Sequence, residues 1–122
     1  MSGRAHYGLE AWKISMRLVK QVYEWSADFP PEERYGLVSQ MRRAAISVPS
    51  NIAEGAARTG SREFARFLAI ARGSLSELDT QYLLAVDLGF ASPNQQLMDS
   101  IEMTSRLVTG LYKKHRKQED RP

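Results

Sequence analysis

Few side chains in this 122-residue sequence are of the types that catalysis needs. There is no cysteine, and the two histidines, His6 and His115, lie in terminal segments that we expect to be mobile. Neither histidine follows a carboxylate by three or four residues, so the Glu-x-x-His pattern of di-metal sites in helical bundles is missing. The serines at positions 47, 50, 74 and 76 have no histidine nearby in the sequence, and the glycines at 55, 60 and 73 are too widely spaced for a phosphate-binding loop. We therefore expect no enzymatic activity, no metal ion and no cofactor.

A second set of polar residues has the spacing of a helix face, and we call it the polar ladder: Arg43, Ser47, Asn51, Glu54, Ser74 and Glu77. Its first four members recur every three or four residues, which places them on one side of a helix. If Gly60 is the turn to an antiparallel helix, residues whose numbers add up to about 120 lie at one level. Arg43 is then opposite Glu77, Ser47 is opposite Ser74, and Glu54 is near Arg66.

Two interpretations of the polar ladder remain open. Its groups can satisfy one another and fix the register of two helices, as partly buried polar residues often do. Alternatively, Asn51, Glu54 and an arginine form a ligand-binding or catalytic cleft. The first interpretation is favoured, because the sequence offers no nucleophile or metal cluster to complete a cleft. Gly73 and the alanines beside the ladder are expected to let two backbones approach closely.

The elements that must position these residues are helices, because apolar residues recur at helical spacing between proline and glycine punctuation. The predicted helices cover about 9–28, 32–58, 61–88 and 93–114. Pro49 lies inside the second apolar stripe and is expected to kink that helix. Short connections favour an all-α, antiparallel up-down-up-down four-helix bundle that occupies residues 1–122 as one domain. The polar residues 113–122 at the end of the fourth helix are expected to fray into a flexible basic tail.

Trp12 and Trp25 leave a further alternative open on the first helix. Either both side chains cap the ends of one core, or one lies outside the core and anchors an interface.

Charge along the chain is more informative than the net charge of +3. One basic cluster surrounds the turn expected at Gly60, and a second follows the fourth helix; together they comprise Arg58, Arg62, Arg66, Lys113, Lys114, Arg116 and Lys117. We expect the two clusters to mark opposite ends of the bundle. Such groups bind phosphates in a salt-sensitive, sequence-independent way, although each cluster alone also fits a solvated surface.

Several motifs carry a family resemblance over roughly residues 9–112: RRAAISVPSNIAEG at 42–55, FLxIAxGSLxEL at 67–78 and LG at 88–89. The sequence resembles the four-helix-bundle proteins named after 23S ribosomal RNA intervening sequences. Proteins of this family are similar to the accessory protein of diversity-generating retroelements, a basic bundle that forms a pentameric ring and is described as binding nucleic acid and a reverse transcriptase. The resemblance supplies no catalytic residue.

The expected function is therefore non-enzymatic: a ring-forming homo-oligomer, a pentamer by resemblance, that binds RNA or DNA through its Arg/Lys-rich surface. The alternative is a protein-interaction scaffold or oligomeric adaptor without nucleic-acid binding, with a reverse transcriptase or another protein as partner. The apolar residues never form a run of about 18, so we expect no membrane span and a soluble cytoplasmic protein.

Overall fold

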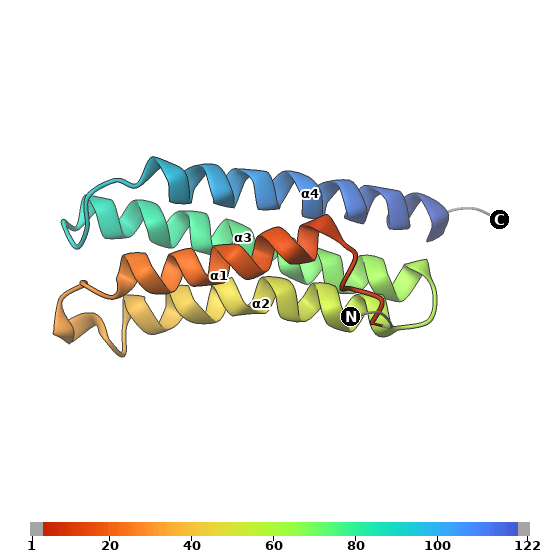
Figure 1. The fold of residues 1–122 in the computed structure, drawn as a ribbon, viewed down its shortest axis with the longest axis horizontal. Helices are drawn as coiled ribbons and strands as arrows, with labels where there is room; N and C mark the ends of the chain where they lie inside the picture. Colours follow the sequence, from red (N-terminus) through yellow and green to blue (C-terminus); the bar gives the residue numbers. More distant parts are fainter. Residues whose placement is uncertain (1–3, 120–122) are drawn as a thin grey trace.

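Four helices make up nearly all of the computed structural model, which describes residues 4–119 (Figure 1). They are α1 (Glu10–Ser26), α2 (Leu37–Ala57), α3 (Ser61–Asp87) and α4 (Gln95–Glu119), with a short 3-10 helix, η1 (Pro31–Glu33), before α2. No strand occurs within the described residues, so the fold is all-α.

The helix bounds differ from the predicted ones at two connections. The residues from Pro31 form the turn η1, and α2 starts only after Gly36, where Glu33 accepts a hydrogen bond from the Leu37 N–H at 3.2 Å. At the start of α4, the Asn94 side chain accepts the Leu97 N–H at 3.0 Å, which is the geometry of an N-cap. Local side-chain caps, rather than the prolines, therefore decide where these helices begin.

The end of α4 is longer than the sequence predicts. The helix continues to Glu119, so the basic run from Lys113 is helical, whereas the sequence predicts that the helix ends near residue 114. Residues 120–122 lie outside the described residues. Lysine and arginine are good helix formers, and positive side chains near the C-terminus complement the helix dipole.

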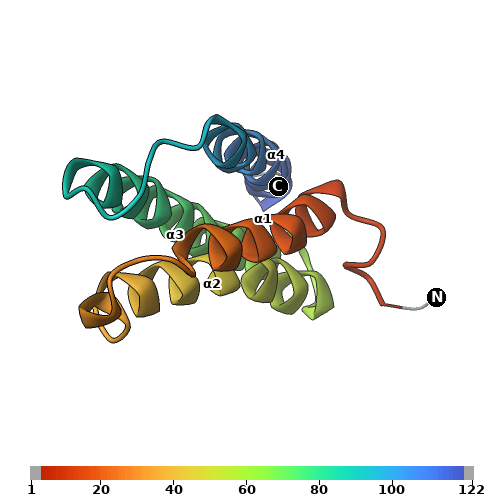
Figure 2. The same ribbon diagram turned by 60° about the vertical axis from the view of Figure 1, so that its left-hand side comes forward.

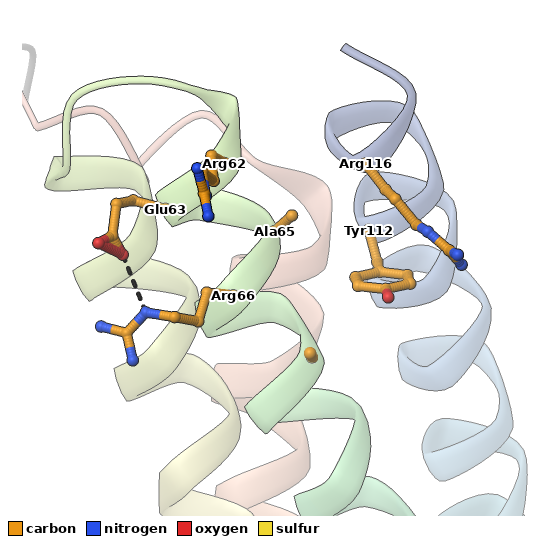
Figure 3. A pocket seen from close by; sticks show the side chains of 7 residues that line it. Arg62, Glu63, Ala65, Arg66, Tyr112 and Arg116 are labelled. Atoms are coloured by element: carbon orange, nitrogen blue, oxygen red, sulfur yellow. Dashed lines mark hydrogen bonds and ion pairs between the residues drawn. The ribbon is translucent and has the colours of Figure 1, made fainter. Parts of the chain in front are cut away.

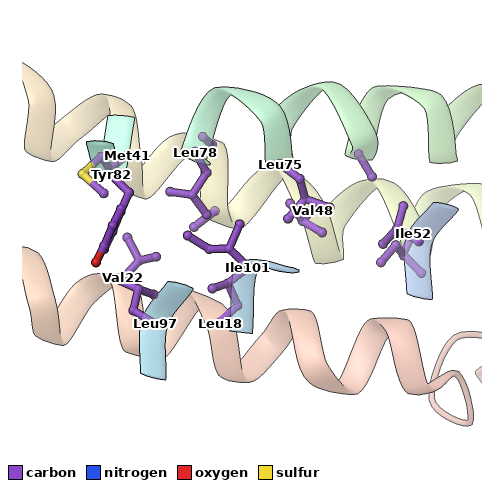
Figure 4. Close-up of a cluster of buried hydrophobic side chains, with 14 of the residues drawn as sticks. Leu18, Val22, Met41, Val48, Ile52, Leu75, Leu78, Tyr82, Leu97 and Ile101 are labelled. Carbon is purple, nitrogen blue, oxygen red and sulfur yellow. The ribbon is translucent and has the colours of Figure 1, made fainter. Parts of the chain in front are cut away.

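One apolar core lies between the four helices (Figures 1 and 2). Helix α2 packs against α1 and α3, and α4 packs against α3 and α1. All four helices contribute fully or almost fully buried side chains, among them Leu18, Val22, Met41, Val48, Ile52, Leu75, Leu78, Leu97 and Ile101 (Figure 4). Aliphatic burial on this scale is the main stabilising contribution to such a fold.

Both tryptophans are partly buried against this core. The Trp25 ring stacks on Tyr82 with centroids 4.8 Å apart, and its indole N–H donates to the Ser92 carbonyl at 3.3 Å. The Trp12 ring contacts His6, with centroids 4.9 Å apart. His6 is thus packed in place, contrary to the mobility expected of the N-terminal segment. Both tryptophans pack against the core, and Trp12 also lines a surface groove.

The α2–α3 contact depends on Gly55. A Cβ at this position would lie 2.8 Å from the Phe67 Cβ and 2.9 Å from the Phe64 Cδ1, so the two helices approach as closely as a glycine allows. Gly73, in contrast, has no atom within 4 Å of such a Cβ. The expectation that Gly73 permits close backbone approach is wrong; that role falls to Gly55.

The two basic clusters lie at the same end of the molecule, and the prediction of opposite ends is wrong. His115 on α4 reaches the start of α3, where its Nδ1 is 3.0 Å from the Ser61 Oγ and its ring lies 4.4 Å from that of Phe64. In Figure 1 the α2–α3 turn and the end of α4 share one end of the molecule. Because short connections join the four helices, α4 ends at the same end of the molecule as α2. His115 is packed here rather than mobile.

Candidate functional site

A groove runs between α3 and α4 near this end, and we call it the basic groove. Two adjoining hollows of about 420 and 330 Å³ form it and share Ala69. Its floor consists of small side chains, which are Ala65, Ala69, Gly73 and Ser76 on α3 and Ser105 and Thr109 on α4. Because these side chains are short, a ligand in the groove can approach the helix backbones closely.

The wider part of the groove has basic walls. Arg62 and Arg66 come from α3, while Tyr112 and Arg116 come from α4, and in Figure 3 the Arg66 side chain extends toward Glu63, away from α4. Among the described residues, Glu63 is the one carboxylate that lines this hollow, and its Oε2 accepts a hydrogen bond from the Arg66 Nε at 2.9 Å. The described lining of this hollow is therefore rich in arginine.

The Glu63 carboxyl responds to this positive surrounding. The hydrogen bond from Arg66 is the main cause that lowers its pKa; desolvation opposes the shift, while the charges of Arg66, Arg58 and Arg62 favour it. The carboxylate is therefore held ionised, and it neutralises part of the charge at Arg66.

Tyr112 brings an aromatic ring into the groove. The Arg72 guanidinium lies 4.6 Å from the Tyr112 ring centroid, and the Arg72 Nε donates to the Thr109 Oγ1 at 3.3 Å. Arg72 was missed by sequence reasoning, because it stands alone between the two basic clusters and joins them only through α3–α4 packing. Arginine beside an aromatic face is a usual arrangement in single-stranded nucleic-acid sites.

The other predicted basic residues surround the groove without lining it. Arg58 forms an ion pair with Glu54 at 3.2 Å and lies 5.2 Å from the Phe67 ring centroid. Lys113, Lys114 and Lys117 are exposed on the last turns of α4. Of the seven predicted residues, Arg62, Arg66 and Arg116 are thus brought together, and the remaining four add charge to the same end.

His115 lies at the edge of this surface. Its ring packs on Phe64, and burial is the main cause that lowers its pKa from the ordinary value of 6.5, with the charge of Lys114 acting in the same direction. The neutral imidazole is therefore favoured, and it bonds to Ser61.

The polar ladder forms a bridge between α2 and α3 at its centre. The Asn51 Nδ2 donates to the Ser47 carbonyl at 2.8 Å and to the Ser47 Oγ at 2.9 Å, and the Ser74 Oγ donates to the Ser47 Oγ at 2.8 Å. These bonds support the register interpretation of the ladder.

The charged members of the ladder do not pair across the helices. Arg43 and Glu77 are exposed and form no ion pair within the described part of the chain, where Glu77 instead accepts a hydrogen bond from Gln81 at 3.4 Å. Glu54 pairs with Arg58, and Arg66 pairs with Glu63, each within its own helix. The expected Glu54–Arg66 proximity is thus replaced by intrahelical pairs, which neighbouring turns form more readily.

The described residues contain neither a cluster of three His, Asp or Glu side chains that could hold a metal ion nor a helix long and apolar enough to cross a membrane.

Comparison with known proteins gives one family. The 23S rRNA-intervening sequence protein family matches residues 8–110, which include α1–α3, their connections and most of α4. Tyr112 and Arg116, in the last turns of α4, lie beyond the matched residues. A comparison with curated proteins gave no match. Because the family match covers most of the sequence, the chain belongs to the 23S rRNA-intervening sequence protein family.

Proposed function

We propose that this chain is a non-enzymatic protein that binds RNA or DNA through the basic groove between α3 and α4. The observation that carries the proposal is a groove between α3 and α4 whose described lining includes Arg62, Arg66, Arg72, Arg116 and Tyr112, with the Arg72 guanidinium 4.6 Å from the Tyr112 ring centroid. The family description, which names an rRNA insertion, agrees with an RNA-related role.

In this proposal the arginines bind the sugar–phosphate backbone and Tyr112 contacts a base. The low floor at Ala69 and Gly73 lets the strand approach the helices. Neutralising about three phosphates with arginine makes the logarithm of affinity fall with the logarithm of salt at a slope of about −2 to −3. Affinity for generic RNA should then decrease about 16- to 64-fold between about 50 and 200 mM salt.

A charge-matched pair of variants tests this site. Replacing Arg62, Arg66 and Arg116 together by Gln should weaken binding of a generic RNA about tenfold or more and reduce the salt slope, as measured by fluorescence anisotropy. The control replaces three exposed cations elsewhere, Arg17, Lys20 and Arg106, by Gln. Equal losses of affinity in both variants would show that net charge alone causes the loss. Unchanged binding in the groove variant would overturn the proposal.

We further propose that the chain assembles as a homo-oligomeric ring, a pentamer, of antiparallel up-down-up-down bundles whose second helix bends at Pro49. An apolar groove of about 380 Å³ between α1 and α2 supports self-association; it is lined by Trp12, Met16, Val19, Ile46, Pro49, Ser50 and Ala53. Met16 is 49% exposed and Ile46 is 42% exposed, although both belong to residue types that are usually buried. The same groove favours the alternative function, a scaffold for another protein.

A further inference from the structure

A second basic hollow, of about 280 Å³, lies where α1 ends and α2 begins. This connection is at the end of the molecule opposite to the α2–α3 turn (Figure 1). Arg34, Tyr35, Arg42 and Arg43 line the hollow together with Tyr23, and no carboxylate is among its lining residues. The hollow shares no lining residue with the basic groove, so the two are separate.

One side of this hollow is held in place by Arg42. Its Nε donates to the Ser26 Oγ at 3.0 Å, and its Nη2 donates to the Tyr23 carbonyl at 3.2 Å. The guanidinium also lies 4.3 Å from the Tyr23 ring centroid. Arg42 therefore completes the end of α1 and presents a fixed positive charge at low conformational cost.

The other side carries Tyr35, the most exposed large aromatic residue of the described chain at 86%. The Arg34 guanidinium lies 5.4 Å from its ring centroid, and Arg43 is exposed on the first half of α2. An exposed tyrosine between arginines stabilises nothing inside this chain, whereas it has the composition of a stacking platform for an unpaired base.

Three acidic residues near this end do not line the hollow. The Glu33 side chain accepts a hydrogen bond from the Leu37 N–H at the start of α2. Glu24 and Asp28 line a different hollow, beside Trp25 and Asn94. Among the described residues, the charged side chains that line the hollow with Tyr35 are all arginines, which attract anions.

We propose that Tyr35, Arg34 and Arg43 form a second contact for single-stranded nucleic acid, in which Tyr35 stacks on an unpaired base and the two arginines bind the flanking phosphates. This site is independent of the basic groove. A strand long enough to reach both ends of the molecule would engage the two sites together and gain affinity from their linkage.

The test isolates the second site by using the Arg62/Arg66/Arg116→Gln variant as background. Fluorescein-labelled oligo(U) is titrated at low salt, and anisotropy is measured with and without Tyr35→Ala. Loss of one stacking platform should weaken the residual binding about tenfold. Tyr35→Phe, which keeps the ring, should retain binding, while Arg43→Gln should lower affinity and the salt slope together. Because Tyr35 is exposed, these variants should keep the wild-type melting temperature.

Each outcome separates this proposal from the function proposed for the basic groove. Residual binding that Tyr35→Ala leaves unchanged, or that Tyr35→Phe weakens equally, overturns base stacking at Tyr35. No binding at all in the background variant also overturns the second site while supporting the groove. If the background variant binds like the wild type and Tyr35→Ala abolishes binding, the groove proposal fails and the second site stands. A change of oligomer mass in Tyr35→Ala, seen by light scattering without a change in affinity, would make this face a subunit contact instead.

Discussion

The arginines of this protein differ in how much of their charge a ligand can use. Arg42 is engaged by the end of α1, whereas Arg58 and Arg66 form ion pairs with Glu54 and Glu63 whose side chains are about half exposed. Exposed ion pairs contribute about 0–1 kcal/mol, so a phosphate can replace either carboxylate at small cost. Intrahelical pairing therefore orients these two arginines without removing them from the basic surface.

At the scale of single residues, His115 predicts a pH dependence of stability. Its pKa is lowered in the folded chain, so the unfolded chain takes up the proton first as the pH falls. The stabilising contribution of the neutral ring is present above the ordinary value of 6.5 and is lost as the pH falls through the lowered folded pKa. Thermal unfolding between about pH 8 and 5 should show the wild type losing more stability than His115→Gln over this interval. His6→Gln is the control, and parallel curves for wild type and His115→Gln would contradict the prediction.

The four helices could be predicted from sequence because apolar spacing, helix-breaking residues and core formation all depend on local pattern. Local pattern also predicts the Ser47–Asn51–Ser74 cluster, since one turn at Gly60 sets the level of both helices. The start of α2 at Leu37 was missed, because the residues from Pro31 form η1 and the Glu33 side chain then bonds to the Leu37 N–H. The basic groove was missed because Arg72, Thr109 and Tyr112 meet only through packing of α3 on α4.

Replacement of glycine by alanine should have opposite effects on stability at Gly55 and at Gly110, because only Gly55 lies in a tight contact between two helices. Gly55→Ala places a Cβ against the Phe67 Cβ, which is fixed to its backbone, so the helices must separate at a cost of about 1–3 kcal/mol. Gly110→Ala lies in the exposed interior of α4 with no atom within 4 Å, so the higher helix propensity of alanine should stabilise by about 0.5–1 kcal/mol. Urea unfolding measures both. A Gly55→Ala variant as stable as the wild type would show that the two helices are not in close contact.

At the scale of the whole molecule, the apolar surfaces occupy different faces from the basic groove. The groove between α1 and α2 contains Trp12 and Met16, and the end of α3 carries three exposed leucines, Leu83, Leu84 and Leu88, which are 51%, 46% and 60% exposed. Two different apolar surfaces on one chain fit a head-to-tail contact, in which the leucines at the end of α3 of one copy enter the groove of the next. Such contacts close into rings when the rotation between copies allows it.

This arrangement predicts the behaviour of two variants in light scattering. Met16→Glu introduces a charge into the α1–α2 groove, and Leu84→Glu does so among the exposed leucines near the end of α3, so each should convert the proposed oligomer to monomer while leaving the helical circular dichroism spectrum unchanged. Because the contact is head-to-tail, mixing the two variants leaves one intact groove and one intact set of leucines, and a mixture should form dimers but no ring. Met103→Glu, at an exposed apolar residue of α4 outside both surfaces, is the matched control. A wild-type chain with monomer mass at micromolar concentration would refute the assembly, and a mixture that stays monomeric would refute the head-to-tail geometry.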